Sequence, residues 1–259
     1  MTNASPNVLL KTNSLGISFG GLRAVDNFEI TVNEGEIVGL IGPNGAGKTT
    51  CFNMITGVYK PTDGDVRLGS DKIDGLPTHA INRLGIARTF QNIRLFRSMS
   101  VLDNVRVALH SQVNYGFWRS VFRGPSYWAM ERKVSARAVE LLKVFGLDNR
   151  LKDEAGSLPY GEQRKLEIVR AMATSPKLLL LDEPAAGMNP QETQNLNSLI
   201  HRLRDEFGVT ILLIEHDMSL VMKICERIYV LDYGKEIANG TPADIRANKK
   251  VIKAYLGEE

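Results

Sequence analysis

The segment 36–50, which reads EIVGLIGPNGAGKTT, constrains the fold of this chain more than any other stretch. Its apolar start, at 36–42, predicts a buried strand, and a helix is predicted from about Lys48 to Thr56, closed by Gly57. The segment 42–50, GPNGAGKTT, contains the full spacing G-x-x-x-x-G-K-[ST]. A chance glycine-rich turn is the alternative, but the flanking strand and helix favour a phosphate-binding loop.

Such a loop works because its glycines let backbone N–H groups converge on phosphate oxygens, beside the positive end of a helix. The Lys48 ammonium is then expected to reach the β- and γ-phosphates, and the Thr49 hydroxyl to bind Mg²⁺. The predicted nucleotide-binding residues of this loop are Gly42, Pro43, Asn44, Gly45, Ala46, Gly47, Lys48, Thr49 and Thr50.

A second apolar run, LLLLDEP at 178–184, ends in two acids. Open α/β sheets bind ligands at the carboxyl ends of their strands. We therefore predict that Asp182 belongs to the Mg²⁺ shell and that Glu183 polarises an attacking water. A buried strand that ends in Asp-Glu is often only structural, so this interpretation depends on the phosphate loop.

Strands and helices alternate through most of the 259 residues, which predicts an α/β fold with a largely parallel sheet. The middle is different, because 95–156 has mainly helical periodicity. We predict one domain over 1–259, with an α/β core at 1–93 and 160–240, a helical subdomain at 94–159 and C-terminal helices at 241–259. Helix starts are predicted at Ser100 and at Thr241, each followed by an acid three residues later.

Composition excludes several classes of protein. A net charge of +3 is too small to indicate nucleic-acid binding. No apolar run approaches the roughly 20 residues that span a bilayer, and the N-terminus lacks a secretory signal pattern. The two cysteines, Cys51 and Cys225, are interpreted as small buried hydrophobic residues. A cytoplasmic chain is expected, linked to a membrane only through a partner.

The ordered set of phosphate loop, ARTFQ, LPYGEQRKLEIVRAM, LLLLDEP, AAGMNP and LLIEHD resembles the ATP-binding cassette of ABC transporters over nearly the whole chain. The resemblance implies a P-loop NTPase (RecA-like) core with an N-terminal antiparallel β subdomain and an inserted helical subdomain. It implies that Gln91, at a strand end, senses Mg²⁺ and the membrane subunit, and that His216 contacts the γ-phosphate. Phe19 is implied to stack on adenine. Taken alone, such a His or Phe would more often be structural.

The resemblance also implies ATP and Mg²⁺ as cofactors and a set of partners. These are a second cassette (a heterodimer, or else a homodimer), two transmembrane permease subunits and, indirectly, an extracytoplasmic solute-binding protein. The chain would lie on the inner face of the cell membrane. A finer resemblance, in SFGGLRAVDN, ARTFQNIRLFRSMSVLDNV, EPAAGMNPQET and AYLG, is to the ATP-binding subunits of branched-chain amino acid uptake systems.

This chain departs from the family at LPYGEQ, where Leu-Ser-Gly-Gly-Gln is usual. In the family this helix start acts on the ATP held by the partner cassette. Pro159 offers neither a hydroxyl nor a backbone N–H, so Gly161, the following amides and the helix dipole remain. We expect a functional but altered site, with Tyr160 available to contact the facing cassette. Asn189 replaces a usual Asp after the acids, and keeps hydrogen bonding without charge.

Alternatives remain open. The same chemistry would serve a lipopolysaccharide-type exporter, and a non-transport cassette or a P-loop kinase would explain fewer motifs. The aromatic stretch 115–130 has two interpretations: a small core for the helical subdomain, or a surface that faces the membrane subunit. Its members are Phe117, Trp118, Phe122 and Trp128. Arg88, Arg94 and Arg97 are similarly ambiguous, since a cluster of charges is usually a solvated face.

Overall fold

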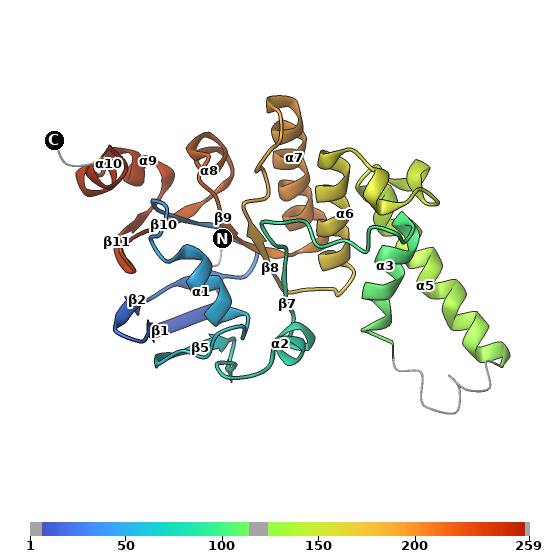
Figure 1. The fold of residues 1–259 in the computed structure, drawn as a ribbon, viewed down its shortest axis with the longest axis horizontal. Coiled ribbons are helices and arrows are strands. Elements are labelled where there is room, and N and C mark those ends of the chain that lie inside the picture. Colours follow the sequence, from blue (N-terminus) through green and yellow to red (C-terminus); the bar gives the residue numbers. More distant parts are fainter. Residues whose placement is uncertain (1–6, 114–123, 257–259) are drawn as a thin grey trace, which may run out of the picture. The chain divides into compact units, whose positions relative to one another are not determined.

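The computed structural model describes residues 7–113 and 124–256, and it divides into two compact units (Figure 1). The first, here called the core unit, combines the residues up to Arg88 with those from Lys177 onward. The second, the helical unit, is Thr89–Pro176. The predicted helical boundaries at 94 and 159 lie inside the second unit, and they stay a prediction.

A six-stranded sheet forms the centre of the core unit. Its order is β11 (Lys235–Gly240), β10 (Arg227–Asp232), β4 (Ile37–Ile41), β9 (Thr210–Ile214), β8 (Leu178–Asp182) and β7 (Ile86–Arg88). All neighbours pair in parallel except β10 and β11. Every residue of β4, β8 and β9 is buried, because a parallel sheet covered on both faces needs continuous apolar strands. The predicted α/β architecture is confirmed.

An antiparallel sheet contributes to the same hydrophobic core. It contains β1 (Val8–Phe19), β2 (Leu22–Phe28), β3 (Thr31–Asn33), β5 (Asp63–Leu68) and β6 (Asp71–Lys72). Its residues pack around helix α1 (Lys48–Ile55), whose Phe52 and Met54 are fully buried. Strand β1 is continuous but contains a bulge, where Ser14 adopts a φ of 44°.

The remaining helices of the core unit are α2 (Thr78–Leu84), α7 (Pro190–Phe207), α8 (Met218–Ile224), α9 (Pro242–Ala247) and α10 (Lys249–Leu256). Helix α8 and the Cys225 that follows it pack closely on β4: a Cβ at Gly39 would lie 3.3 Å from Val221 Cγ1 and 3.0 Å from Cys225 Sγ. The predicted cap of α9 is confirmed: Thr241 and Asp244 form a capping box.

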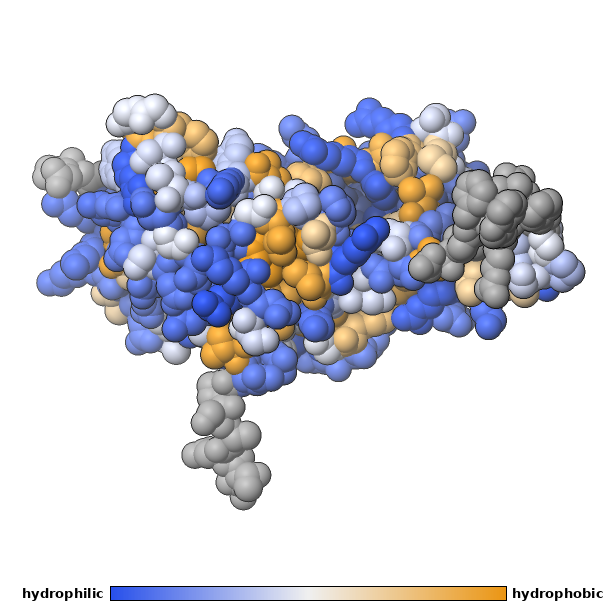
Figure 2. All heavy atoms as spheres, turned by 90° about the horizontal axis from the view of Figure 1, so that it is seen from below, coloured by the Kyte–Doolittle hydropathy of each residue, from blue (hydrophilic) through white to orange (hydrophobic). Residues whose placement is uncertain are grey.

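Much of the face shown in Figure 2 is hydrophilic, and no helix among the described residues is long and apolar enough to cross a membrane.

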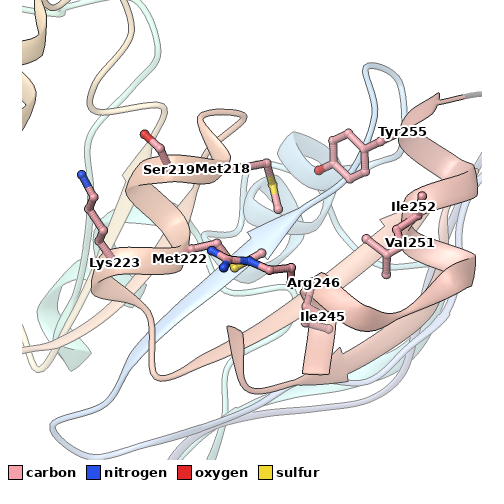
Figure 3. A pocket seen from close by; sticks show the side chains of 9 residues that line it. All are labelled: Met218, Ser219, Met222, Lys223, Ile245, Arg246, Val251, Ile252 and Tyr255. Carbon is pink, nitrogen blue, oxygen red and sulfur yellow. The ribbon is translucent and has the colours of Figure 1, made fainter. Parts of the chain in front are cut away.

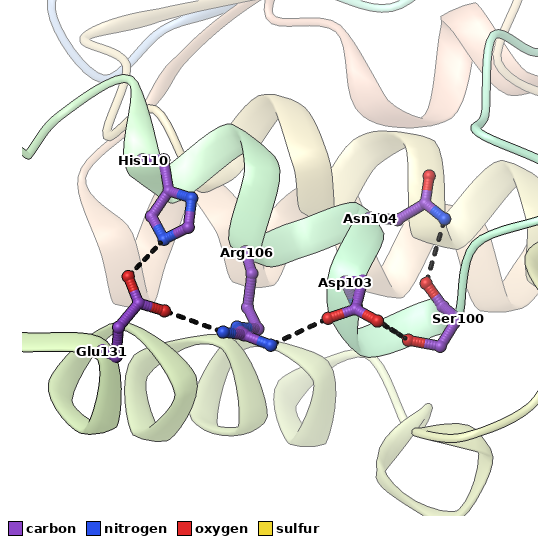
Figure 4. Close-up of polar contacts among 6 residues, drawn as sticks. All are labelled: Ser100, Asp103, Asn104, Arg106, His110 and Glu131. Carbon is purple, nitrogen blue, oxygen red and sulfur yellow. Dashed lines mark hydrogen bonds and ion pairs between the residues drawn. The ribbon is translucent and has the colours of Figure 1, made fainter. Parts of the chain in front are cut away.

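The helical unit contains α3 (Val101–His110), α5 (Pro125–Val144) and α6 (Tyr160–Met172), with short 3₁₀ turns at Asp148–Arg150 and Ala155–Ser157. Ser100 caps α3 as predicted, by accepting a hydrogen bond from the Asp103 backbone N–H. Helices α3 and α5 are joined by Glu131, which accepts from Arg106 Nη2 at 2.8 Å and lies 3.1 Å from His110 Nε2 (Figure 4).

Of the four aromatic residues proposed as a core for this unit, Trp128 lies among the described residues. Phe117, Trp118 and Phe122 lie outside the described residues. Trp128 is 54% exposed and contacts Tyr127 edge to face, so the core interpretation is wrong for this side chain. It lies near the start of α5, before the run of buried positions that begins at Glu131.

Candidate nucleotide-binding site

The phosphate loop lies between β4 and α1, and its glycines are required by the backbone. Gly42 has a φ of 153°, and a Cβ there would lie 2.1 Å from the Leu231 carbonyl oxygen. Gly47 caps α1 with a left-handed φ of 102°. Because side chains are excluded at these two positions, the loop can wrap tightly around the first turn of the helix.

Lys48 is buried in this loop, and its Nζ donates to the carbonyl oxygens of Gly42 at 2.7 Å and Pro43 at 2.9 Å. Burial lowers the pKa of Lys48, while the nearby carboxylates of Glu183 and Asp182 act in the opposite direction. Thr49 is exposed in the first turn of α1, and Thr50 is partly buried beside it. The loop therefore presents an ammonium and a hydroxyl at the carboxyl edge of the sheet.

Asp182 ends β8, where 3% of its surface is exposed, and it is held by Arg88, whose role the sequence left open. Arg88 Nη2 donates to Asp182 Oδ2 at 2.6 Å, and Arg88 Nη1 donates to Asn53 Oδ1 at 2.7 Å. Of the two interpretations left open for Arg88, the solvated face is wrong, because 7% of its side chain is exposed. The available signal was its place directly after a strand, because β7 and β8 are parallel neighbours and end at the same edge.

Glu183 and His216 follow neighbouring strands and lie close together, with His216 Nδ1 3.6 Å from Glu183 Oε2. Glu183 adopts a left-handed φ of 47°, which is uncommon for a residue with a side chain. The buried Glu215, also missed from sequence, accepts from the Ala185 backbone N–H at 2.8 Å and from that of His216 at 3.2 Å. It thereby joins the two segments that carry these side chains.

Two further residues that the sequence singled out, Phe19 and Asn189, also lie in the core unit. Phe19, at the end of β1, is 45% exposed, and its ring meets that of Tyr59 at a centroid distance of 5.3 Å. Asn189 caps α7 by accepting from the Glu192 backbone N–H at 3.0 Å. The Phe19 ring is thus accessible enough for base stacking, and Asn189 has a structural role of its own.

In the helical unit, Gln91 and the start of α6 are tied together by one side chain. Arg164 is fully buried and donates to the carbonyl oxygens of Phe90 at 2.7 Å and Gln91 at 2.8 Å. The prediction that Gln91 ends a strand was wrong, since β7 ends at Arg88. The Gln91 segment is instead held by hydrogen bonds to a helix.

The unusual residues before Gly161 fit this arrangement. Pro159 is the N-cap of α6 and supplies no side-chain hydrogen bond. Tyr160 is 45% exposed, and its hydroxyl accepts from Arg164 Nη2 at 3.2 Å. Gly161 is buried in the first turn. The tyrosine therefore contributes to the same group of hydrogen bonds as the Gln91 carbonyl.

Comparison with known proteins identifies the family. The model of the family described as "ABC transporter" matches residues 25–186. The chain belongs to the ABC transporter family. A second model, described as "Branched-chain amino acid ATP-binding cassette transporter", matches residues 235–259 of this cassette.

The cassette is 51% identical, over 96% of its length and 98% of the relative's, to the high-affinity branched-chain amino acid transport ATP-binding protein LivG of Salmonella typhimurium. It is 39% identical, with the same coverage, to the lipopolysaccharide export system ATP-binding protein LptB of Escherichia coli. A crystal structure of the ADP conformation of MJ1267, an ATP-binding cassette of an ABC transporter, superimposes with a TM-score of 0.83 at 31% identity, covering 97% of this chain and 99% of that one. The P-loop NTPase fold is thereby confirmed.

Proposed function

We propose that this ABC cassette hydrolyses ATP to drive the import of branched-chain, hydrophobic amino acids. The identity of 51% with LivG supports import over the lipopolysaccharide export of LptB, at 39%. The match of the C-terminal residues 235–259 supports the same choice. Two permease subunits, a second cassette and an extracytoplasmic binding protein would complete the transporter, with this chain on the inner face of the membrane.

The residues of the site support MgATP as the ligand. Magnesium is usually held by one or two carboxylates and by phosphate oxygens. The buried Asp182 offers the carboxylate, and ATP would supply the phosphate oxygens. The Thr49 hydroxyl and Gln91 are the other proposed contributors of oxygen atoms. No group of three or more His, Cys, Asp or Glu that could hold a metal by itself occurs among the described residues. When bound, the ion would neutralise phosphate charge, with Arg88 fixing the orientation of Asp182.

The proposed steps use the chain's own side chains. Backbone amides of 42–50 and the Lys48 ammonium bind the phosphates, while Phe19 stacks on the base. Glu183 accepts a proton from the attacking water, and His216 orients the γ-phosphate beside it. The N-terminus of α6, through Gly161, acts on the nucleotide of the facing cassette. Residues 94–159 are the proposed subdomain that couples these events to the membrane subunits.

Complementation separates the two transport functions. The chain would be expressed in one Escherichia coli strain that lacks LivG and in another that is depleted of LptB. We expect restored uptake of radiolabelled leucine in the first strain and no rescue of growth in the second. A Glu183→Gln variant, expressed to the same level, should restore no uptake. Rescue of the LptB-depleted strain without leucine uptake would contradict the proposal.

A further inference from the structure

A cavity of about 580 Å³ lies between α8, α9 and α10, within the core unit and outside the residues assigned above to nucleotide chemistry (Figure 3). Its size falls in the range of about 300–1,000 Å³ that is usual for small-molecule sites. It is lined by Met218, Ser219, Met222, Lys223, Ile245, Arg246, Val251, Ile252 and Tyr255. We call it the α8–α10 cavity.

Six of these nine side chains are apolar or aromatic, and none is acidic. Arg246 extends from α9 toward Met222, whereas Lys223 points away from α10 (Figure 3). Within residues 7–113 and 124–256, no acidic side chain forms an ion pair with Arg246. The cavity therefore combines a hydrocarbon wall with a guanidinium that an anion could pair with.

Residues that line the α8–α10 cavity are connected to two parts of the proposed nucleotide site. Met218 and Ser219 begin α8 directly after Asp217, the N-cap that follows His216. At the opposite side, burial raises the pKa of the Tyr255 hydroxyl, while the backbone of Gly42, the first glycine of the phosphate loop, lies close enough to lower it. A molecule that packs against Met218 and Tyr255 would touch residues linked to both His216 and the phosphate loop.

Helix α10 strengthens this connection. Its residues Lys250, Lys253 and Ala254 line a different cavity, of about 670 Å³, together with the phosphate-loop residues 43–46. One helix thus borders the α8–α10 cavity on one side and the loop on the other. A shift of α10 would change both environments.

We propose that the α8–α10 cavity is a regulatory site for a small aliphatic monocarboxylate, whose carboxylate pairs with Arg246 and whose hydrocarbon body packs against Met218, Met222 and Val251. Guanidinium and carboxylate match in a bidentate geometry, which favours this anion over a neutral alcohol. A free amino acid fits less well, because its ammonium would find no acid among the lining residues. This inference does not depend on which solute is transported.

Three probes with one carbon skeleton test the ligand class: 4-methylpentanoate, leucine and 4-methylpentan-1-ol. Binding to the full-length chain is followed by the ¹³C-methyl NMR signals of Met218 and Met222. We expect 4-methylpentanoate to shift both signals and to bind at least tenfold more tightly than the other two. Arg246→Gln should weaken its binding at least tenfold. The matched variant Lys223→Gln, which removes a charge that points away, should leave it unchanged.

The regulatory part is tested with the non-hydrolysable nucleotide MgAMP-PNP. Because coupling between two sites is reciprocal, the affinity for 4-methylpentanoate should change at least twofold when the nucleotide is bound. Tyr255→Phe keeps the ring but removes the hydroxyl, so it should keep binding and abolish this change. An unchanged affinity in the parent chain would overturn the regulatory role.

Two results would overturn the site itself. The first is equal binding of the acid and the alcohol, since the guanidinium would then contribute nothing. The second is methionine signals that shift with protein concentration and not with any probe, which would identify this face as a contact between copies of the chain.

Discussion

Arg164 Nη2 donates a hydrogen bond to the Gln91 carbonyl oxygen at 2.8 Å, and thereby ties the segment that carries Gln91 to helix α6, which begins at the unusual LPYGEQ segment. The same guanidinium pairs with Glu167 at 2.9 Å and bonds to the Tyr160 hydroxyl at 3.2 Å. One side chain, with no exposed surface, thus links residues 73 positions apart.

Replacing Arg164 with Met should both destabilise the chain and impair ATP turnover. Removing one partner of a buried ion pair costs about 3–5 kcal/mol, because the other charge is left uncompensated. Urea unfolding measures this loss. The double variant Arg164→Met, Glu167→Gln should recover much of the stability, since the buried charge is gone, but it cannot recover the bond to Gln91. Full recovery of turnover in the double variant would show that this bond has no functional role.

Replacing Pro159 with Ser tests whether the unusual LPYGEQ segment at the start of α6 is impaired or only altered in its action on ATP. Serine can cap α6, which lacks a side-chain cap, so the free energy of unfolding should rise by about 1 kcal/mol. ATP turnover in the assembled transporter should change by less than about tenfold, equivalent to about 1.4 kcal/mol in the barrier. A far larger increase would mean that the natural site is defective. Tyr160→Phe, which removes only the hydroxyl, is the companion variant.

Replacing Arg88 with Met should cost about 3–5 kcal/mol, because Asp182 would lose its buried partner. The same change should raise the KM for MgATP, since the carboxylate would no longer be oriented. Arg83→Met, on the exposed part of α2, is the matched control and should alter stability by no more than about 0.5 kcal/mol. Chemical denaturation and steady-state kinetics are the measurements. Equal stabilities of the two variants would refute the role of the ion pair.

Glu215→Gln should change the pH dependence of stability. Burial raises the pKa of Glu215, because it disfavours the ionised carboxylate. The stability that the protonated carboxyl contributes is fully present below the unfolded-state pKa, and it is lost as pH rises through the folded-state pKa. Glutamine does not ionise and keeps an acceptor for the Ala185 N–H. The free energy of unfolding of the variant, relative to the parent, should therefore increase as pH rises from the unfolded-state pKa of Glu215 through its folded-state pKa. A difference that is constant over this range would contradict the assignment.

Local patterns predicted the phosphate loop, the strand before Asp182 and the caps at Ser100 and Thr241, because each depends on a few adjacent residues. The Arg88–Asp182 pair joins residues 94 positions apart, and only the order of β7 and β8 in the sheet brings them together.

The left-handed backbone of Glu183 has a consequence for how this position is maintained. A residue with a side chain costs of order 1–3 kcal/mol in that region, whereas glycine adopts it freely. The fold alone would therefore accept glycine at 183, and only the need for a carboxylate beside His216 opposes it. The strained backbone therefore favours glycine at this position, whereas the proposed role of the carboxylate in activating water favours glutamate.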